Sequence, residues 1–111
     1  LELGHHADAV RRYDAALRLE PDRWEAAVNR GRALCALGKL EEGLAAFRQV
    51  LDRDPENLSA AINAENVLFQ LGRMPEAEAM AARAVELART RGGADQVART
   101  VARLNSRPSA P

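Results

Sequence analysis

The sequence predicts an all-α solenoid in which antiparallel helix pairs stack on copies of themselves. The pair Leu-Gly occurs three times at an interval of 34 residues, as Leu3-Gly4, Leu37-Gly38 and Leu71-Gly72. Other apolar and turn positions keep that interval: Tyr13 with Phe47, Leu17 with Leu51, Pro21 with Pro55, Val28 with Ile62, Asn29 with Asn63 and Leu34 with Leu68. A fixed period of this length is the signature of one supersecondary unit repeated along the chain. No sustained alternation of apolar and polar residues indicates a strand.

Residue spacing predicts six helices, at about 6–19, 24–37, 41–53, 57–71, 75–90 and 94–105. Segments 24–37 and 58–71 carry apolar or small residues at helical spacing, which indicates one buried stripe on each. Gly38 and Gly72 follow these stripes directly. Because glycine takes the left-handed conformation without a Cβ clash, we expect each of them to end its helix and turn the chain back.

Start and stop signals frame the other helices. Pro75 fits the first turn of a helix, where its missing N–H would be unpaired in any case. Pro21 and Pro55 end the helices that precede them. Asp22, with Glu25 three residues later, predicts a capping box for the helix that follows.

The two ends of the chain differ from the regular pattern. Residues 1–4 correspond to residues 35–38, so the first unit should keep only the last turn of its first helix, closed by Leu3-Gly4. After Gly92-Gly93, apolar residues at helical spacing over 94–105 predict a helix that caps the last unit. Residues 106–111 have the composition of a linker or a frayed terminus.

The core should consist of the large apolar residues on the inner faces of these helices. Ten residues are expected to be mostly buried: Tyr13, Leu17, Leu34, Leu37, Leu44, Phe47, Leu51, Leu68, Leu71 and Val85. Phe47 should plug the space between the two helices of its own unit. Aromatic residues make up only 4% of the chain, so alanine, leucine and valine must fill most of the remaining core.

The period and its motif resemble the tetratricopeptide repeat family, whose unit is two antiparallel helices in 34 residues. In residues 22–55, the family positions for Gly, Tyr, Phe and Pro are occupied by Gly31, Leu34, Phe47 and Pro55. The departures there replace Trp, Leu and Ala of the family pattern by Ala27, Arg30 and Gly43. The next unit keeps Leu68 and Ala77 and has Glu65, Ala81 and Arg89 at the Gly, Phe and Pro sites.

The resemblance implies right-handed superhelical stacking of these units. Residues 1–21 would end with the second helix of a truncated first repeat, 22–55 would form a repeat and 56–89 a degenerate repeat. Residues 90–105 would form the capping helix, and 106–111 a flexible tail.

Composition and motifs favour recognition over chemistry. The net charge is zero, and no apolar run approaches the roughly 20 residues that a membrane-spanning helix needs. Cys35 is the only cysteine, which excludes an internal disulfide and leaves the compartment undecided. His5-His6 with Asp8 lacks further ligands to complete a metal site, and Cys35 lacks a histidine partner. We therefore expect no metal, no cofactor and no catalytic residues.

The resemblance also implies a concave groove, lined by the first helices of successive units, that holds peptides or helices of partner proteins. Carried over by position, the groove residues are Glu25, Val28, Asn29, Arg32, Cys35 and Ala36, then Ser59, Ile62, Asn63, Asn66, Phe69 and Gln70. Asn29 and Asn63 could bind a peptide backbone, since a carboxamide donates and accepts, or could instead tie neighbouring helices together. Arg32 suits a carboxylate, and Arg103 would join it if the final helix keeps the repeat register.

The resemblance and these groove residues predict a protein-interaction module, a scaffold or adaptor, that binds a partner peptide or helix in the concave groove and prefers a peptide that bears a carboxylate. One alternative is an accessory domain of a larger enzyme. Another is a weak binder of acidic surfaces or nucleic acid through six arginines: Arg83, Arg89, Arg91, Arg99, Arg103 and Arg107. Because the helix around Tyr13 should lack part of its cover, weak self-association through the N-terminal end is also expected.

Overall fold

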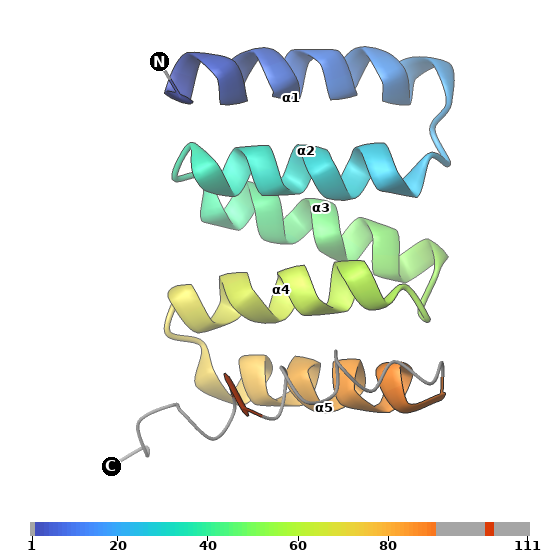
Figure 1. Ribbon diagram of the computed structural model, residues 1–111, viewed down its shortest axis with the longest axis vertical. Helices are drawn as coiled ribbons and strands as arrows, with labels where there is room; N and C mark the ends of the chain where they lie inside the picture. Colours follow the sequence, from blue (N-terminus) through green and yellow to red (C-terminus); the bar gives the residue numbers. More distant parts are fainter. Residues whose placement is uncertain (1, 91–101, 104–111) are drawn as a thin grey trace.

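The computed structural model describes residues 2–90 and 102–103. In this part of the chain the elements are α1 (Glu2–Leu19), α2 (Trp24–Ala36), α3 (Leu40–Arg53), α4 (Leu58–Gln70) and α5 (Met74–Thr90). Successive helices run antiparallel, and the described residues contain no strand (Figure 1). The predicted all-α fold is confirmed. Of the predicted final helix, residues 102–103 are helical, whereas the rest of 94–105 and the tail lie outside the described residues.

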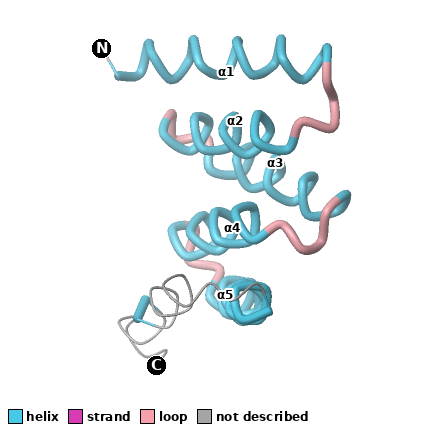
Figure 2. The backbone as a smooth tube through the Cα atoms, turned by 45° about the vertical axis from the view of Figure 1, so that its right-hand side comes forward, coloured by secondary structure: helices cyan, strands magenta, loops and turns pink. Residues whose placement is uncertain are grey.

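Helices that follow one another in sequence pack together. In addition, α2 contacts α4 directly, across the intervening α3. Figure 2 shows α1 from the side and α5 nearly end-on, so the helix direction rotates along the stack. The first helices of two successive pairs, α2 and α4, therefore lie side by side within a twisted solenoid.

Gly38 and Gly72 close the connections after α2 and α4, as the sequence predicts. Their φ angles are 82° and 76°, in the left-handed region that favours glycine. Lys39 N donates to Leu34 O at 2.9 Å, and Arg73 N donates to Leu68 O at 3.0 Å. The same hydrogen bond therefore closes both turns, one repeat apart. Pro75 is the second residue of α5, within the first turn as expected.

The capping box predicted from Asp22 and Glu25 is wrong. Arg23 precedes α2, and no side chain caps the helix there. The Asp22 carboxylate forms an ion pair with Arg53 of α3 instead, so a tertiary contact has replaced the local one. A side-chain cap occurs one repeat later, where Asn57 Oδ1 accepts from Ala60 N at 2.9 Å at the start of α4.

The helix start expected at about residue 6 is also wrong. Gly4 lies inside α1, which begins at Glu2 and runs for 18 residues, so Leu3-Gly4 does not form a turn. A glycine inside a helix costs only about 1 kcal/mol relative to alanine, and the helical sequence on either side overrides it. Leu-Gly therefore marks a turn only where the chain folds back onto a following helix.

The core lies among α2, α3, α4 and α5. Five of its ten expected members are buried: Leu34, Leu44, Phe47, Leu51 and Leu68. Five others are only partly buried: Tyr13, Leu17, Leu37, Leu71 and Val85. The partly buried residues lie on the outer helices α1 and α5 or in the two turns, where fewer neighbours cover them. Alanines with no exposed surface complete the core on α4 and α5: Ala60, Ala61, Ala64, Ala77, Ala81 and Ala84.

Glycines allow α2 and α3 to approach closely. A Cβ on Gly31 would lie 2.6 Å from Cε1 of Phe47, well inside van der Waals contact. A Cβ on Gly43 would lie 2.3 Å from Cys35 Sγ and 2.9 Å from Gly31 O. Gly43 therefore stands where the family pattern has alanine because the backbone and sulfur of α2 leave no room for a methyl group.

The next helix pair distributes side-chain volume in the opposite way. One repeat after Gly31 and Phe47 stand Glu65 and Ala81, and neither has any exposed surface. In this pair the long side chain comes from the first helix and the small one from the second. The two helix pairs share an arrangement of helices and differ in how that arrangement is filled.

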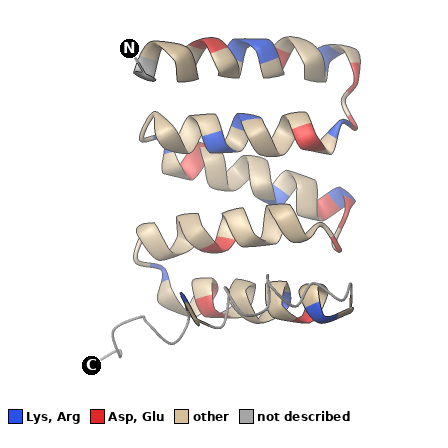
Figure 3. Cartoon of the chain, in the orientation of Figure 1, with Lys and Arg blue, Asp and Glu red and all other residues tan. Residues whose placement is uncertain are grey.

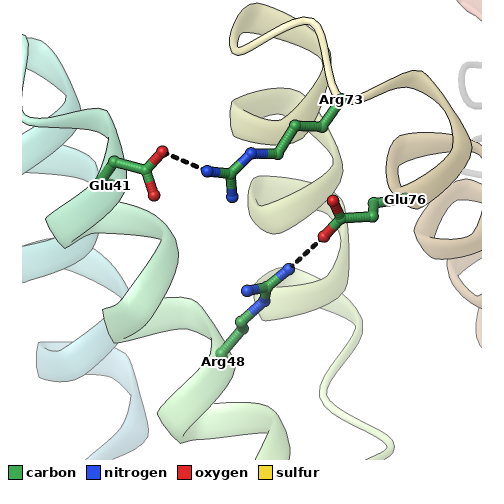
Figure 4. A network of polar contacts seen from close by, with 4 residues as sticks. All are labelled: Glu41, Arg48, Arg73 and Glu76. Carbon is green, nitrogen blue, oxygen red and sulfur yellow. Dashed lines mark hydrogen bonds and ion pairs between the residues drawn. The ribbon is translucent and has the colours of Figure 1, made fainter.

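Two ion pairs connect α3 with the following helix pair (Figure 4). Arg48 Nη2 lies 2.9 Å from Glu76 Oε2 on α5, and Arg73 Nη2 lies 2.6 Å from Glu41 Oε1. All four side chains are at least 38% exposed, so each pair contributes at most about 1 kcal/mol. These contacts therefore contribute little to the stability of the fold.

Candidate peptide-binding groove

The candidate groove residues occupy matching positions on α2 and α4. Asn29 and Arg32 lie about one turn apart on α2, and Asn63 and Asn66 hold the same positions on α4. Because α2 and α4 pack against each other, these equivalent faces adjoin. Arg32 is exposed, and the three asparagines are partly exposed.

The other candidates differ in accessibility. Glu25, Ala36 and Gln70 are exposed. Partly exposed candidates are Cys35, Ser59, Ile62 and Phe69. Val28 is only 3% exposed and belongs to the core, so it is not available to a ligand.

Asn63 uses part of its hydrogen-bonding capacity within its own helix. Its Nδ2 donates to Ser59 O at 2.8 Å. A carboxamide has two N–H donors and an acceptor oxygen, so one bond of this kind does not exhaust it. The bond gives Asn63 a structural role inside α4, which is neither of the two roles that the sequence suggested.

Arg103 reaches α4 from the C-terminal part of the chain. Its Nη1 donates to Asn66 Oδ1 at 2.6 Å, and its Nη2 lies 2.9 Å from Glu65 Oε2. The Arg103 side chain is 30% exposed, whereas that of Glu65 has no exposed surface. Burial lowers the pKa of the Arg103 guanidinium from its usual value. Arg103 therefore contacts one of the candidate groove residues, Asn66, and binds the carboxylate beside it.

Glu65 is not among the residues that sequence reasoning singled out for a site. The sequence feature that could have drawn attention to Glu65 is its repeat position, where the family pattern has a glycine. A buried carboxylate requires a cationic partner or hydrogen-bond donors, because its desolvation costs several kcal/mol, on the order of the stability of a small domain. That requirement could have directed a search for an arginine such as Arg103.

Cys35 and the potential metal-binding side chains are the other residues in the described part of the chain that could carry chemistry. Burial raises the pKa of the Cys35 thiol, which favours its unreactive protonated form. No group of three or more His, Cys, Asp or Glu side chains that could hold a metal ion occurs within residues 2–90 and 102–103. Among the helices described, none is long and apolar enough to cross a membrane.

A family model of the tetratricopeptide repeat matches the chain over residues 1–57 and again over 28–95. The two matches together cover residues 1–95, which is well over half of the 111 residues. The chain belongs to the tetratricopeptide repeat family. Tetratricopeptide repeats generally mediate protein–protein interactions, and their antiparallel helix pairs are the pairs seen here in α2–α3 and α4–α5. No match was found among curated proteins.

Proposed function

We propose that this tetratricopeptide repeat chain is a non-enzymatic interaction module that binds a peptide or helix of a partner protein along α2 and α4. The observation that carries the proposal is the pairing of an exposed arginine, Arg32, with partly exposed asparagines on two adjoining helices. A guanidinium offers a planar set of N–H donors that matches a carboxylate, and carboxamides suit a peptide backbone. The expected ligand is a peptide that bears a carboxylate.

Replacing Arg32 by alanine should lower the affinity for a carboxylate-bearing peptide about fivefold, which corresponds to the loss of one exposed charge pair. The melting temperature should stay unchanged, because an exposed arginine contributes little to stability. Affinity can be measured by titration calorimetry with a peptide selected against the intact chain. The same peptide with its carboxylates converted to amides should no longer distinguish Arg32→Ala from the wild type.

Arg12 provides the matched control, since it is an exposed arginine on α1, away from the proposed groove. Arg12→Ala should leave the affinity of the selected peptide unchanged. Equal affinities of the wild type and Arg32→Ala for the carboxylate form would remove Arg32 from the site.

A second candidate interaction is weak self-association through α1. None of the α1 side chains described, at positions 4–19, is buried, whereas α2, α3, α4 and α5 each carry at least four buried residues. Ala9, Tyr13, Ala16 and Leu17 are partly exposed on this helix. Apolar surface of this kind is a common site of association between copies.

Sedimentation at increasing protein concentration should therefore reveal a weak, reversible dimer. Ala9→Glu places a charge among the partly buried residues of α1 and should shift the equilibrium towards the monomer. Ala15→Glu, on the exposed face of the same helix, is the control and should leave the equilibrium unchanged. A chain that stays monomeric at tens of micromolar, or equal behaviour of the two variants, would contradict self-association.

Nucleic-acid binding is not part of the proposal, because the described arginines of the C-terminal cluster have protein contacts. Arg83 Nη2 donates to Pro55 O at 2.8 Å, and Arg89 Nη1 lies 3.8 Å from Glu86 Oε2. Arg103 binds Glu65, as described above. The other three arginines, Arg91, Arg99 and Arg107, lie outside the described residues.

A further inference from the structure

A cleft of about 680 Å³ opens between the end of α1, the start of α2 and the end of α3. Its accessible apolar wall includes Leu17, Trp24 and Ala27. Trp24 is 42% exposed, one of the few large apolar side chains left accessible in the described part of the fold. None of the residues that line the cleft belongs to the candidate groove, so the cleft is a separate surface.

The next repeat shows what normally fills this position. One repeat later, Leu17, Trp24 and Arg53 are replaced by Leu51, Leu58 and Leu87. Leu51 and Leu58 are 5% and 7% exposed there, and Leu87 packs against the core. The equivalent junction, formed by the end of α3, the start of α4 and the end of α5, is thus lined by leucines.

At the first junction an arginine, Arg53, stands in place of the leucine. Arg53 forms an ion pair with Asp22 across the mouth of the cleft, and its side chain is 67% exposed. A guanidinium is unfavourable in an apolar space, because it loses its hydration there. Trp24, in the place of Leu58, keeps much of its ring accessible.

The residues that line the cleft carry a net negative charge. Asp22, Asp52 and Asp54 face a single cation, Arg53, which is already paired with Asp22. Three negative charges less one positive charge leave a net charge of −2. Figure 3 shows acidic positions at the α1–α2 and α3–α4 connections, which flank this end of the fold.

The Asp54 carboxylate is held in place by its neighbours. Its Oδ1 accepts from Glu56 N and its Oδ2 from Asn57 Nδ2, both at 3.3 Å. Asp52 is exposed near the end of α3, two residues before it. An acidic rim around an apolar, aromatic wall is complementary to a side chain with an apolar stem and a cationic head.

We propose that this cleft binds a lysine or arginine side chain of a partner peptide. The aliphatic stem lies along Leu17 and Ala27, and the cationic head meets Asp52 and the face of Trp24. Attraction between a cation and an indole ring adds to the charge complementarity. The cleft would thus recognise basic residues on one surface of the solenoid, while the proposed groove recognises carboxylates on another.

Trp24 is the only tryptophan of the chain, so its fluorescence reports on this cleft alone. The probe is a short acetylated and amidated alanine peptide with one central arginine, titrated into the full chain at low ionic strength. A saturable change in Trp24 emission is expected. The same peptide with a central glutamate should cause none.

Asp52→Asn should raise the dissociation constant of the arginine peptide about three- to fivefold, the effect of one exposed charge. Glu86→Gln is the matched control, because Glu86 holds the same position one repeat later, at the junction lined by leucines. It should leave the dissociation constant unchanged. Arg32→Ala should also leave it unchanged, which separates this site from the proposed groove.

Two results would overturn the proposal. One is an emission that does not change, or changes without saturation, as the arginine peptide is added. The other is an equal effect of Asp52→Asn and Glu86→Gln, which would mean that the peptide responds to overall charge and not to the cleft.

Discussion

Phe47→Ala is expected to lower the free energy of unfolding by about 3–5 kcal/mol, a large share of the stability of a domain of this size. Phe47 is 1% exposed, and its ring fills the space that Gly31 leaves between α2 and α3. Glycine cannot move into the vacated volume, so the cavity should persist. Urea unfolding followed by circular dichroism measures the loss.

Leu19→Ala is the control for this substitution. Leu19 is 84% exposed at the end of α1, so its removal should change the free energy of unfolding by less than about 0.5 kcal/mol. A loss below about 1 kcal/mol for Phe47→Ala would show that the ring is not the plug between α2 and α3.

Arg103→Ala is expected to cost about 3 kcal/mol, because it removes a charged partner from a carboxylate with no exposed surface. Urea unfolding of the full chain again measures the change. The loss should exceed that of Arg83→Ala, an exposed arginine whose described bond is to a backbone carbonyl, Pro55 O.

A double variant separates the charge from the packing. Glu65→Leu combined with Arg103→Ala removes both members of the pair and leaves an apolar side chain of similar length in the core. Replacing a whole buried ion pair by apolar groups is often neutral or stabilising, so the double variant should be more stable than Arg103→Ala alone. If both variants were equally destabilised, burial of the Glu65 charge would not be the cause.

The turns were predictable from sequence because they depend on local backbone conformation. Gly38 and Gly72 have positive φ angles at the two points where a helix ends and the chain reverses. Glycine favours this conformation at helix ends largely independently of tertiary contacts. Helix existence followed equally well from apolar spacing. The prediction of a capping box was wrong because the Asp22 carboxylate can bind either a local backbone N–H or the distant Arg53. Which partner it binds depends on the tertiary structure.

Parts of the candidate site were less accessible to sequence reasoning. The repeat period indicates which positions of α2 and α4 correspond, and Arg32 is exposed on α2. Arg103 and Glu65 are far apart in the sequence, with all of α5 between them. No periodic pattern predicts their contact. The cleft beside Trp24 was not predicted from the sequence either, because it arises from the packing of three helices and not from a motif.

The opposite filling of the two helix pairs limits how such a gene can change. Gly31 leaves room for Phe47 in one pair, and the equivalent positions of the next pair hold Glu65 and Ala81. A crossover between copies that joined α2 to the partner of α4 would leave a void where two small residues meet. The reciprocal product would force a phenylalanine and a glutamate into one space. Recombination at the boundary between pairs keeps both matches, so the heritable unit of this chain is the intact pair and not the single helix.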